Sequence, residues 1–392
     1  MSRFLFVVPP LVGHINPAAG VAAELAARGH AMAWACADPG LVRRLAGDAA
    51  RVFPCAGPVP GNGDSVRPPE IRGPEALKFL WERFLVPLAD EMAPGVRAAV
   101  REFAPDAVVA DQQALAGGLV AERLGLPWAT SATTSAEFTD ALAGIPKVAL
   151  WLDGQLRGLR ERIGDPALQD DPRFSPHLVL TFSTRELAGD SPFTGGRIRW
   201  VGPAVAPRPS AAVDFPWDWL DPSRAKVLVT LGTANADVGA RFLTECVTVL
   251  RERADRVQGV VVDPGRVLGE PGDDKDVLVA PSVPQLLLLE RVDAVVCHAG
   301  HNTVCEALWH GVPLVVAPIR DDQPVVAGQV TDAGAGVRVR FGRVSAAKLG
   351  SALDAVLDEP QYRASADRIR TAFRAAGGAG AAATHLERLA RP

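Results

Sequence analysis

A phosphate-binding pattern is visible near the middle of the C-terminal half of the sequence. Residues 293–297 have the apolar composition of a buried strand, and they are followed by a small-residue turn at 298–301. We expect a helix to begin at Asn302 and to end near Gly311. A strand that leads through a Gly-containing turn into a helix presents backbone N–H groups and the positive end of the helix dipole to an anion. The pattern therefore predicts a phosphate site at this turn.

A carboxylate follows the same turn. Glu306 lies one turn into the predicted helix, where it can accept hydrogen bonds from a ribose diol. Together with the phosphate site, it predicts a binding site for a nucleotide diphosphate. We expect the contacts at the turn to come from His298, Gly300, Asn302 and Thr303.

A second pair of reactive residues lies in the N-terminal half. His14 follows a predicted strand at residues 3–8, in a loop at 9–15 that is not a GxGxxG motif, and Asp111 ends another strand. Parallel strands share one carboxyl edge, so the two side chains are expected to meet there. An imidazole is mostly neutral at pH 7, with an unperturbed pKa of about 6.5, and is suited to accept a proton. The structural alternative is that His14 caps the first helix and that Asp111 pairs with a nearby donor.

The order of these motifs is similar to that of a known family. Pro284-Gln285, the series from His298 to Glu306, Gly311-Val312-Pro313 and Asp322-Gln323 together resemble the donor-binding signature of family 1 glycosyltransferases. This signature is shared by plant secondary-product glucosyltransferases and by bacterial macrolide and carotenoid glycosyltransferases. In the N-terminal half, Gly13-His14-Ile15-Asn16-Pro17 resembles the loop that carries the catalytic base in this family, and Trp219-Leu220-Asp221 with Gly232-Thr233 resembles the opening of its C-terminal domain.

The resemblance implies a fold and a reaction. The fold is the α/β GT-B fold, in which two Rossmann-like, doubly wound parallel-sheet domains face a central cleft. The reaction is an inverting transfer of a hexose, with a glucose-like sugar favoured, from a UDP- or dTDP-sugar to an acceptor hydroxyl, amide or amine. His14 is expected to act as the base, with Asp111 orienting its ring.

The resemblance also assigns the donor contacts. Gln285 is expected at the ribose, the backbone of Val283 at the base, and Thr233, after Gly232, as a hydroxyl donor to the phosphates. Ser282 stands where plant relatives carry a Trp that stacks on uracil, so uridine and thymidine remain open. Asp322 and Gln323 match the pair that holds the sugar hydroxyls, although a helix N-cap explains them structurally. The Asn that relatives carry three residues later is Val326 here.

The acceptor is expected to be a small apolar natural product such as a polyketide, macrolide, terpenoid or phenol. We expect Gly13, Phe138 and Trp151 to contact it, although core packing explains the two aromatic residues equally well. Two other functions share the expected fold. A sugar-nucleotide epimerase releases diphosphate without an acceptor, and a non-catalytic helper binds a partner but has no need of His14 and Asp111.

The composition of the chain limits the classes of ligand that we expect it to bind. The chain has 392 residues, 48% of them hydrophobic and 22% charged, with a net charge of −4, which disfavours nucleic acid as a ligand. Its five cysteines form no CxxC pair, and the N-terminus has no signal-peptide core, so we expect a cytoplasmic protein. No apolar run reaches the roughly 18 residues of a membrane helix. We expect a monomer or homodimer.

No cofactor or metal is expected. The nucleotide sugar is a co-substrate. His298, His301 and His310 do not have the i,i+4 spacing of a two-histidine helical zinc site, and no acidic cluster suited to magnesium accompanies them or Cys305.

The expected organisation follows from alternating strands and helices. We predict an N-terminal acceptor-binding domain at 1–202, a Pro-rich linker at 203–218, a nucleotide-sugar-binding domain at 219–375, and a C-terminal helix at 376–392 that packs back on the first domain. A mobile loop is expected at 57–74. Residues 75–103 are predicted to be helical with interruptions at Pro87 and Pro94, and residues 131–171 to be less regular.

Overall fold

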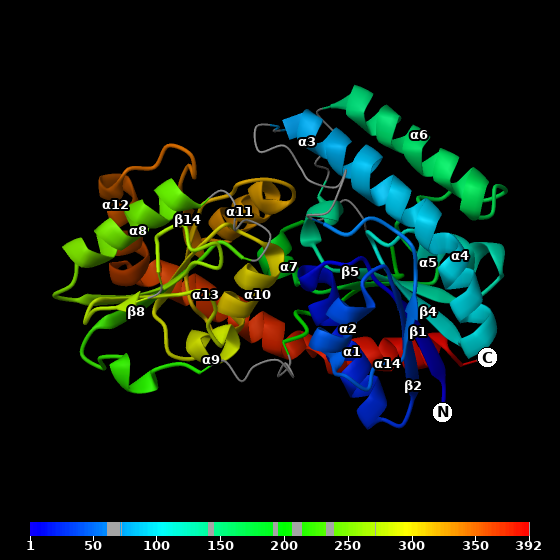
Figure 1. Cartoon of the computed structure of the whole chain (residues 1–392), viewed down its shortest axis with the longest axis horizontal. Coiled ribbons are helices and arrows are strands. Elements are labelled where there is room, and N and C mark those ends of the chain that lie inside the picture. The colour runs from blue at the N-terminus through cyan, green and yellow to red at the C-terminus, as the bar shows by residue number, and fades with distance from the viewer. Residues whose placement is uncertain are drawn as a thin grey trace. The chain divides into compact units, whose positions relative to one another are not determined.

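The computed structural model describes residues 1–60, 71, 73–139, 145–190, 195–205, 214–232, 239–270 and 272–391. The chain divides into two compact units, shown in Figure 1. The first unit comprises residues 1–184, 190–210 and 376–392, and the second comprises 185–189 and 211–375. Residues 61–70 and 72 of the predicted mobile loop at 57–74, and residues 206–213 of the predicted linker at 203–218, lie outside the described residues.

The first unit is built on a parallel sheet. Within the described ranges it has seven strands in the order β3-β2-β1-β4-β5-β6-β7. The strands are β1 Arg3–Val7, β2 Ala31–Cys36, β3 Val52–Pro54, β4 Ala107–Asp111, β5 Trp128–Ala132, β6 Leu178–Thr181 and β7 Ile198–Trp200. Its helices are α1 Val12–Ala27, α2 Pro39–Ala46, α3 Gly73–Phe79, α4 Val86–Phe103, α5 Ala116–Arg123, α6 Pro146–Ile163 and α14 Gly378–Leu389, with a 3₁₀ turn at Ser135–Phe138.

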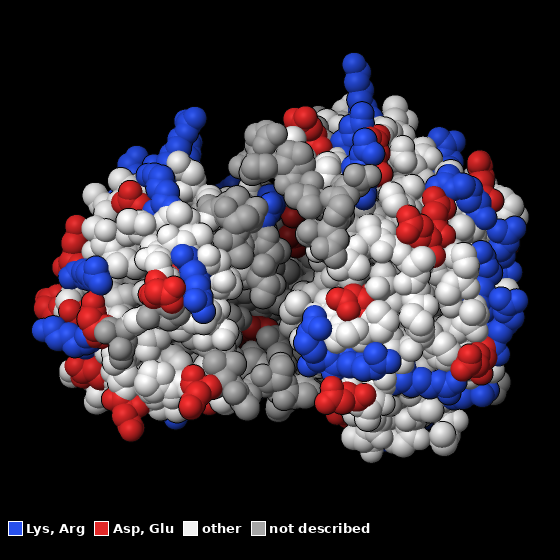
Figure 2. All heavy atoms as spheres, in the orientation of Figure 1, with Lys and Arg blue, Asp and Glu red and all other residues white. Residues whose placement is uncertain are grey.

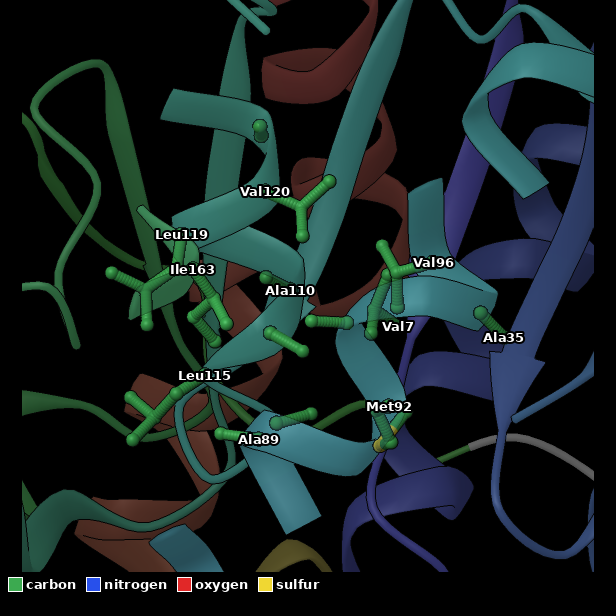
Figure 3. Close-up of a cluster of buried hydrophobic side chains, with 14 of the residues drawn as sticks. Val7, Ala35, Ala89, Met92, Val96, Ala110, Leu115, Leu119, Val120 and Ile163 are labelled. Atoms are coloured by element: carbon green, nitrogen blue, oxygen red, sulfur yellow. The ribbon is translucent and has the colours of Figure 1, made fainter. Parts of the chain in front are cut away.

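Helices cover both faces of this sheet. On one face, α4, α5 and α6 bury a cluster in which Val7 and Ala110 of the sheet lie with Met92 and Val96 of α4 and Leu119 of α5 (Figure 3). On the other face, α1, α2 and α14 cover a second cluster. Strands buried on both faces read as continuous apolar runs, which is why β1 and β4 were recognisable in the sequence.

The C-terminal helix belongs to the first unit. Arg28, the C-cap residue of α1, donates hydrogen bonds from its guanidinium to Thr384 Oγ1 at 3.0 Å and to Glu387 Oε2 at 3.2 Å, both on α14. Buried Ala382, Ala383 and Leu386 add apolar contacts. The chain therefore ends on the unit in which it began.

The second unit repeats this architecture. Its described strands form the order β10-β11-β9-β8-β12-β13-β14, parallel except for the short β10. They are β8 Ala225–Thr230, β9 Val257–Val262, β10 Gly272–Asp273, β11 Val277–Ala280, β12 Ala294–Cys297, β13 Leu314–Val316 and β14 Gly336–Arg338. The helices are α7 Arg185–Ala188, α8 Ala240–Glu252, α9 Gln285–Leu289, α10 His301–Trp309, α11 Gln323–Asp332, α12 Ala346–Asp358 and α13 Pro360–Ala376, with a 3₁₀ turn at Trp217–Trp219.

Each sheet has one point at which its strand order reverses. In the first unit the reversal lies between β1 and β4, and in the second between β8 and β12. Open α/β sheets bind ligands outside the carboxyl ends of the strands at such switch points. The expected α/β fold with two doubly wound parallel-sheet domains is confirmed in both units.

Three local predictions were wrong. The first helix begins at Val12, so His14 lies in its first turn rather than in a loop. Residues 73–103 are helical without a break at Pro87 or Pro94, although residues 80–85 form a π-helical segment. Pro87 lies just after the π-helical segment, and the helix continues through it. Packing of the apolar face of α4 on the sheet outweighs the cost of Pro94 inside the helix.

The predicted irregular region at 131–171 contains an 18-residue helix, α6. Its buried residues Leu152, Leu156, Leu159 and Ile163 recur at helical spacing, a period that the sequence reading missed. A buried ion pair holds the helix to α5, because the Arg160 guanidinium donates to both carboxylate oxygens of Glu122 at 2.9 and 3.2 Å. Burial raises the pKa of Glu122 despite this partner.

Charges of both signs share the surface. On the face shown in Figure 2, Lys and Arg side chains lie among Asp and Glu side chains. Among the described residues, opposite charges form ion pairs, such as that of Arg162 with Asp90 at 2.8 Å. Among the described helices, none is both long and apolar enough to cross a membrane.

Candidate active site

The first unit brings His14 and Asp111 together at its switch point. His14 lies in the first turn of α1, directly after β1, and Asp111 is the last residue of the neighbouring strand β4. The His14 Nδ1 atom lies 2.9 Å from Asp111 Oδ1. The Asp111 side chain is fully buried, whereas the His14 side chain is 15% exposed. The histidine therefore retains access to solvent while its partner has none.

A third residue joins this pair. Thr133, just beyond the end of β5, places its Oγ1 atom 2.8 Å from His14 Nδ1 and donates a 3.1 Å hydrogen bond to Asp111 Oδ2. Sequence reasoning missed Thr133. Two features of the sequence could have indicated it. Thr133 follows a strand that neighbours β4, and residues 130–135 are all Ser or Thr except Ala132.

These contacts select one tautomer of the His14 ring. The Thr133 hydroxyl hydrogen is directed at Asp111, so its oxygen is an acceptor toward His14. An ionised carboxylate is also an acceptor, and Asp111 Oδ1 already receives the backbone N–H of Gln113 at 2.8 Å. Nδ1 of His14 therefore carries the hydrogen and donates it. The lone pair of the neutral ring is then on Nε2, which points away from the carboxylate.

The second unit assembles the predicted phosphate turn at its own switch point. His298 follows β12, and Gly232 follows the neighbouring strand β8. A Cβ atom on Gly232 would lie 2.8 Å from Cε1 of His298, and Gly232 has a positive φ of 69°. A Cβ on Gly300 would overlap Nε2 of the same ring. Both glycines are therefore needed for the imidazole to occupy its position. Thr233 lies outside the described residues.

The His298 imidazole is neutral. It is 7% exposed. Its pKa is lowered to about 4, mainly by burial, with a backbone contact to Thr230 acting in the opposite direction and the positive charge of Arg320 lowering it further. At neutral pH this residue therefore brings no positive charge to the site.

The helix that follows begins without a capping side chain. Gly300 is the N-cap of α10, which begins at His301, one residue earlier than predicted. Asn302 and Thr303 lie in its first turn, where Thr303 is buried and Asn302 half-buried. A glycine N-cap offers no side-chain oxygen to the first N–H groups. The binding of an anion at this helix N-terminus stays a prediction.

The two predicted ribose contacts touch each other. Gln285, the first residue of α9, donates a 2.6 Å hydrogen bond from Nε2 to Oε2 of Glu306 on α10. Glu306 is buried. Ser282 and Val283 precede α9; Ser282 is exposed and Val283 packs partly against the core of the unit.

The predicted sugar contacts lie at the start of α11. Asp322 is the N-cap residue of α11, but its side chain makes no capping hydrogen bond. Helix capping therefore does not explain the Asp322 side chain. Gln323 is buried, and its Oε1 atom accepts the backbone N–H groups of Ile319 at 2.9 Å and Arg320 at 3.0 Å. Only the Nε2 end of Gln323 can therefore serve as a donor to a sugar.

The three predicted acceptor contacts lie in different surroundings. Gly13 is exposed in the first turn of α1, beside His14. Phe138 is 2% exposed and packs against Phe174 and Trp200 with ring centroids 5.5 and 5.7 Å away, so it is a core residue here. Trp151 on α6 is half-buried against the core beneath that helix.

His301 and Cys305 lie four residues apart on α10, and Sγ of Cys305 is 3.4 Å from Nε2 of His301. Across the described part of the chain, no three His, Cys, Asp or Glu residues group as metal ligands.

Several known proteins are similar to this chain in sequence and in fold. The family model for UDP-glucoronosyl and UDP-glucosyl transferase matches residues 270–374. The chain is 31% identical to 4'-demethylrebeccamycin synthase of Lentzea aerocolonigenes, over 95% of this chain and 96% of the relative. It is 28% identical to demethyllactenocin mycarosyltransferase of Streptomyces fradiae, over 100% of this chain and 87% of the relative.

Solved structures of glycosyltransferases are also similar to this chain. The structure of the kitacinnamycin glycosyltransferase is similar to this chain with a TM-score of 0.79 and 26% identity, over 99% of this chain and 98% of the other. The glycosyltransferase VinC is similar with a TM-score of 0.73 and 22% identity, over 99% of each chain, a likeness that concerns the fold alone.

Proposed function

Since this chain belongs to the family of UDP-glucuronosyl and UDP-glucosyl transferases and is a nucleotide-sugar-dependent glycosyltransferase, we propose that it is an inverting hexosyltransferase with His14 as its base. The donor is a UDP- or dTDP-sugar. The acceptor is a hydroxyl, or an amide or amine, of a small apolar natural product.

The observation that carries the proposal is the contact of His14 Nδ1 with Asp111 and Thr133. A neutral hydroxyl is a weak nucleophile and must lose its proton as it attacks. In this reaction the acceptor oxygen bonds to the anomeric carbon from the face opposite the diphosphate. The bond from that carbon to the phosphate oxygen breaks, its electron pair leaves with the diphosphate, and the hydroxyl proton passes to Nε2 of His14. Asp111 then stabilises the imidazolium.

The second unit supplies the donor contacts. Gly300, His298 and the first turn of α10, with Asn302 and Thr303, hold the diphosphate, and Gly232 lies at the adjacent strand end. Thr233, the next residue in the sequence, adds a hydroxyl donor to the phosphates. N–H groups aimed at the leaving oxygen stabilise the charge that develops there. The Gln285–Glu306 pair receives the ribose, Ser282 and Val283 the base, and Asp322 and Gln323 the sugar hydroxyls.

The names of the relatives support the acceptor class. They refer to a rebeccamycin derivative and to the mycarosylation of demethyllactenocin, and a zeaxanthin glucosyltransferase of Pantoea ananas is 26% identical over 99% of this chain. These names support a natural-product acceptor, and they leave the sugar and the acceptor of this chain to experiment.

A mass-spectrometric screen of UDP- and dTDP-sugars against a panel of apolar acceptors tests the proposal. We expect glycosylated product with wild-type protein and none with His14→Ala, which should still bind UDP or dTDP. Incubation with donor alone separates the epimerase alternative, since rapid epimer formation without an acceptor would exclude the transferase reaction. Wild-type turnover by His14→Ala would show that the base is another group.

A further inference from the structure

The residues proposed for the donor carry no positive charge. His298 is neutral because of its burial, and the two ionisable groups among the others, Glu306 and Asp322, are acids. A diphosphate is multiply charged, and the leaving group gains further charge in the transition state. Helix N-terminal N–H groups stabilise such charge only through partial dipoles. A full positive charge close to the turn would add to their effect.

One arginine is positioned to supply it. β13 pairs with β12 in the register Cys297–Val316, and the backbone N–H of Ala317 donates to the carbonyl of Cys297 at 2.8 Å. The chain leaving β13 therefore runs beside His298, at the carboxyl edge of the sheet. Arg320 lies four residues beyond the end of β13, on the turn that leads into α11.

Hydrogen bonds fix the backbone of this turn. Oε1 of buried Gln323 accepts the backbone N–H groups of both Ile319 and Arg320, and the backbone N–H of Gln323 donates to the carbonyl of Arg320 at 3.2 Å. Asp321 has a left-handed φ of 56°, which turns the chain sharply after Arg320. Gln323 is thus a positioning residue for the backbone of Arg320.

The positive charge of Arg320 has an electrostatic effect at the phosphate turn. Its positive charge adds to burial in lowering the pKa of His298. A cation close enough to act on this imidazole is close enough to act on an anion bound beside it, because both effects follow the same Coulomb law.

We propose that Arg320 is the cation of the donor site, which binds the diphosphate of the sugar nucleotide and stabilises the charge on the departing nucleoside diphosphate. The inference rests on the proposed function. A guanidinium suits this role because it stays charged at all relevant pH values and matches two phosphate oxygens at once.

Calorimetric titration with UDP and dTDP tests the assignment. We expect Arg320→Gln to raise the Kd for the nucleoside diphosphate by about tenfold or more, the effect of losing a charge-assisted hydrogen bond. The loss should be smaller for the corresponding nucleoside monophosphates. Arg320→Lys should restore part of the affinity because it keeps the charge. The matched control is Arg338→Gln, which removes an exposed arginine from the neighbouring β14 and should change Kd less than twofold.

An NMR titration of His298 gives a readout that does not depend on a ligand. Removing a nearby positive charge makes protonation easier, so the pKa of His298 should rise in Arg320→Gln and stay unchanged in Arg338→Gln.

The outcomes separate the two proposals. If the wild type binds UDP or dTDP and Arg320→Gln binds it equally well, the assignment to Arg320 is wrong while the proposed function stands. Equal losses of monophosphate and diphosphate affinity together with a lower melting temperature would mean a structural role, and would also overturn it. If the wild type binds neither UDP nor dTDP, the donor class and the role of Arg320 fail together.

Discussion

Gln285 donates a 2.6 Å hydrogen bond from Nε2 to Oε2 of Glu306, and this contact joins the first turn of α9 to the middle of α10. The two residues lie 21 positions apart and were predicted independently to contact a ribose. The bond constrains the orientation of the buried carboxylate. The two residues therefore form one binding element rather than two separate contacts.

Glu306→Gln should weaken UDP or dTDP binding about tenfold, because it removes the carboxylate charge and replaces a charge-assisted hydrogen bond with a neutral one. Gln285→Ala should cost less, since the carboxylate remains. Isothermal calorimetry measures both. The matched control is Glu290→Gln, an exposed acid at the C-cap of α9. Unchanged affinity in Glu306→Gln would remove the ribose role.

Thr133→Val should lower kcat by about five- to tenfold, as expected from losing one hydrogen bond to His14 and one to Asp111. The side-chain shape is kept, so the KM for the donor should not change. A shifted pH dependence of kcat/KM would show that the effect passes through His14. Thr133→Ser keeps the hydroxyl and should retain most activity. A Thr133→Val enzyme with wild-type kcat and pH profile would reduce Thr133 to a packing residue.

Gly300→Ala should impair nucleotide binding severely. The added Cβ would overlap Nε2 of His298, and the buried ring has little room to move. We expect at least a tenfold rise in the Kd for UDP or dTDP. Gly328→Ala on α11 is the matched control, because a Cβ there meets no atom within 4 Å. Comparable Kd values for the two variants would contradict the close approach of Gly300 to His298.

The stability of the second unit should fall in acid partly through His298. Its pKa in the folded protein is about 4, below the ordinary 6.5, so between these values the unfolded chain binds a proton that the folded chain does not. Stability is therefore lost as the pH falls from 6.5 toward 4, by up to roughly 3 kcal/mol at about 1.4 kcal/mol per pH unit. Urea unfolding of wild type and His298→Gln at pH 7, 6 and 5 measures the difference.

A surface-histidine variant, His177→Gln, should keep the wild-type pH dependence in the same experiment, since His177 is exposed. Parallel stability curves for wild type and His298→Gln would mean that the burial of the His298 ring does not govern its protonation.

Much of the fold was predictable from local patterns. Continuous apolar strands such as β1 and β12, followed by helices, indicate parallel sheets, and this prediction is confirmed. The family was predictable because its signature is compact, running from Pro284 to Gln323 in 40 residues of sequence. Helix boundaries were less predictable: α6 was missed and Pro94 did not interrupt α4, since tertiary packing outweighs local preferences there.

The sequence by itself determined the reaction class and the neighbourhood of His14, Asp111 and the 298–306 turn, because spacing along one strand–turn–helix unit is local information. The tertiary structure decided which residues join them. Thr133 reaches His14 from the end of a strand, 119 residues away, and Phe138 turns into the core. The register of β12 and β13 brings the chain that leads to Arg320 beside the chain that leads to His298. Such contacts depend on which strands are neighbours and in what register, and no short stretch of sequence encodes that arrangement.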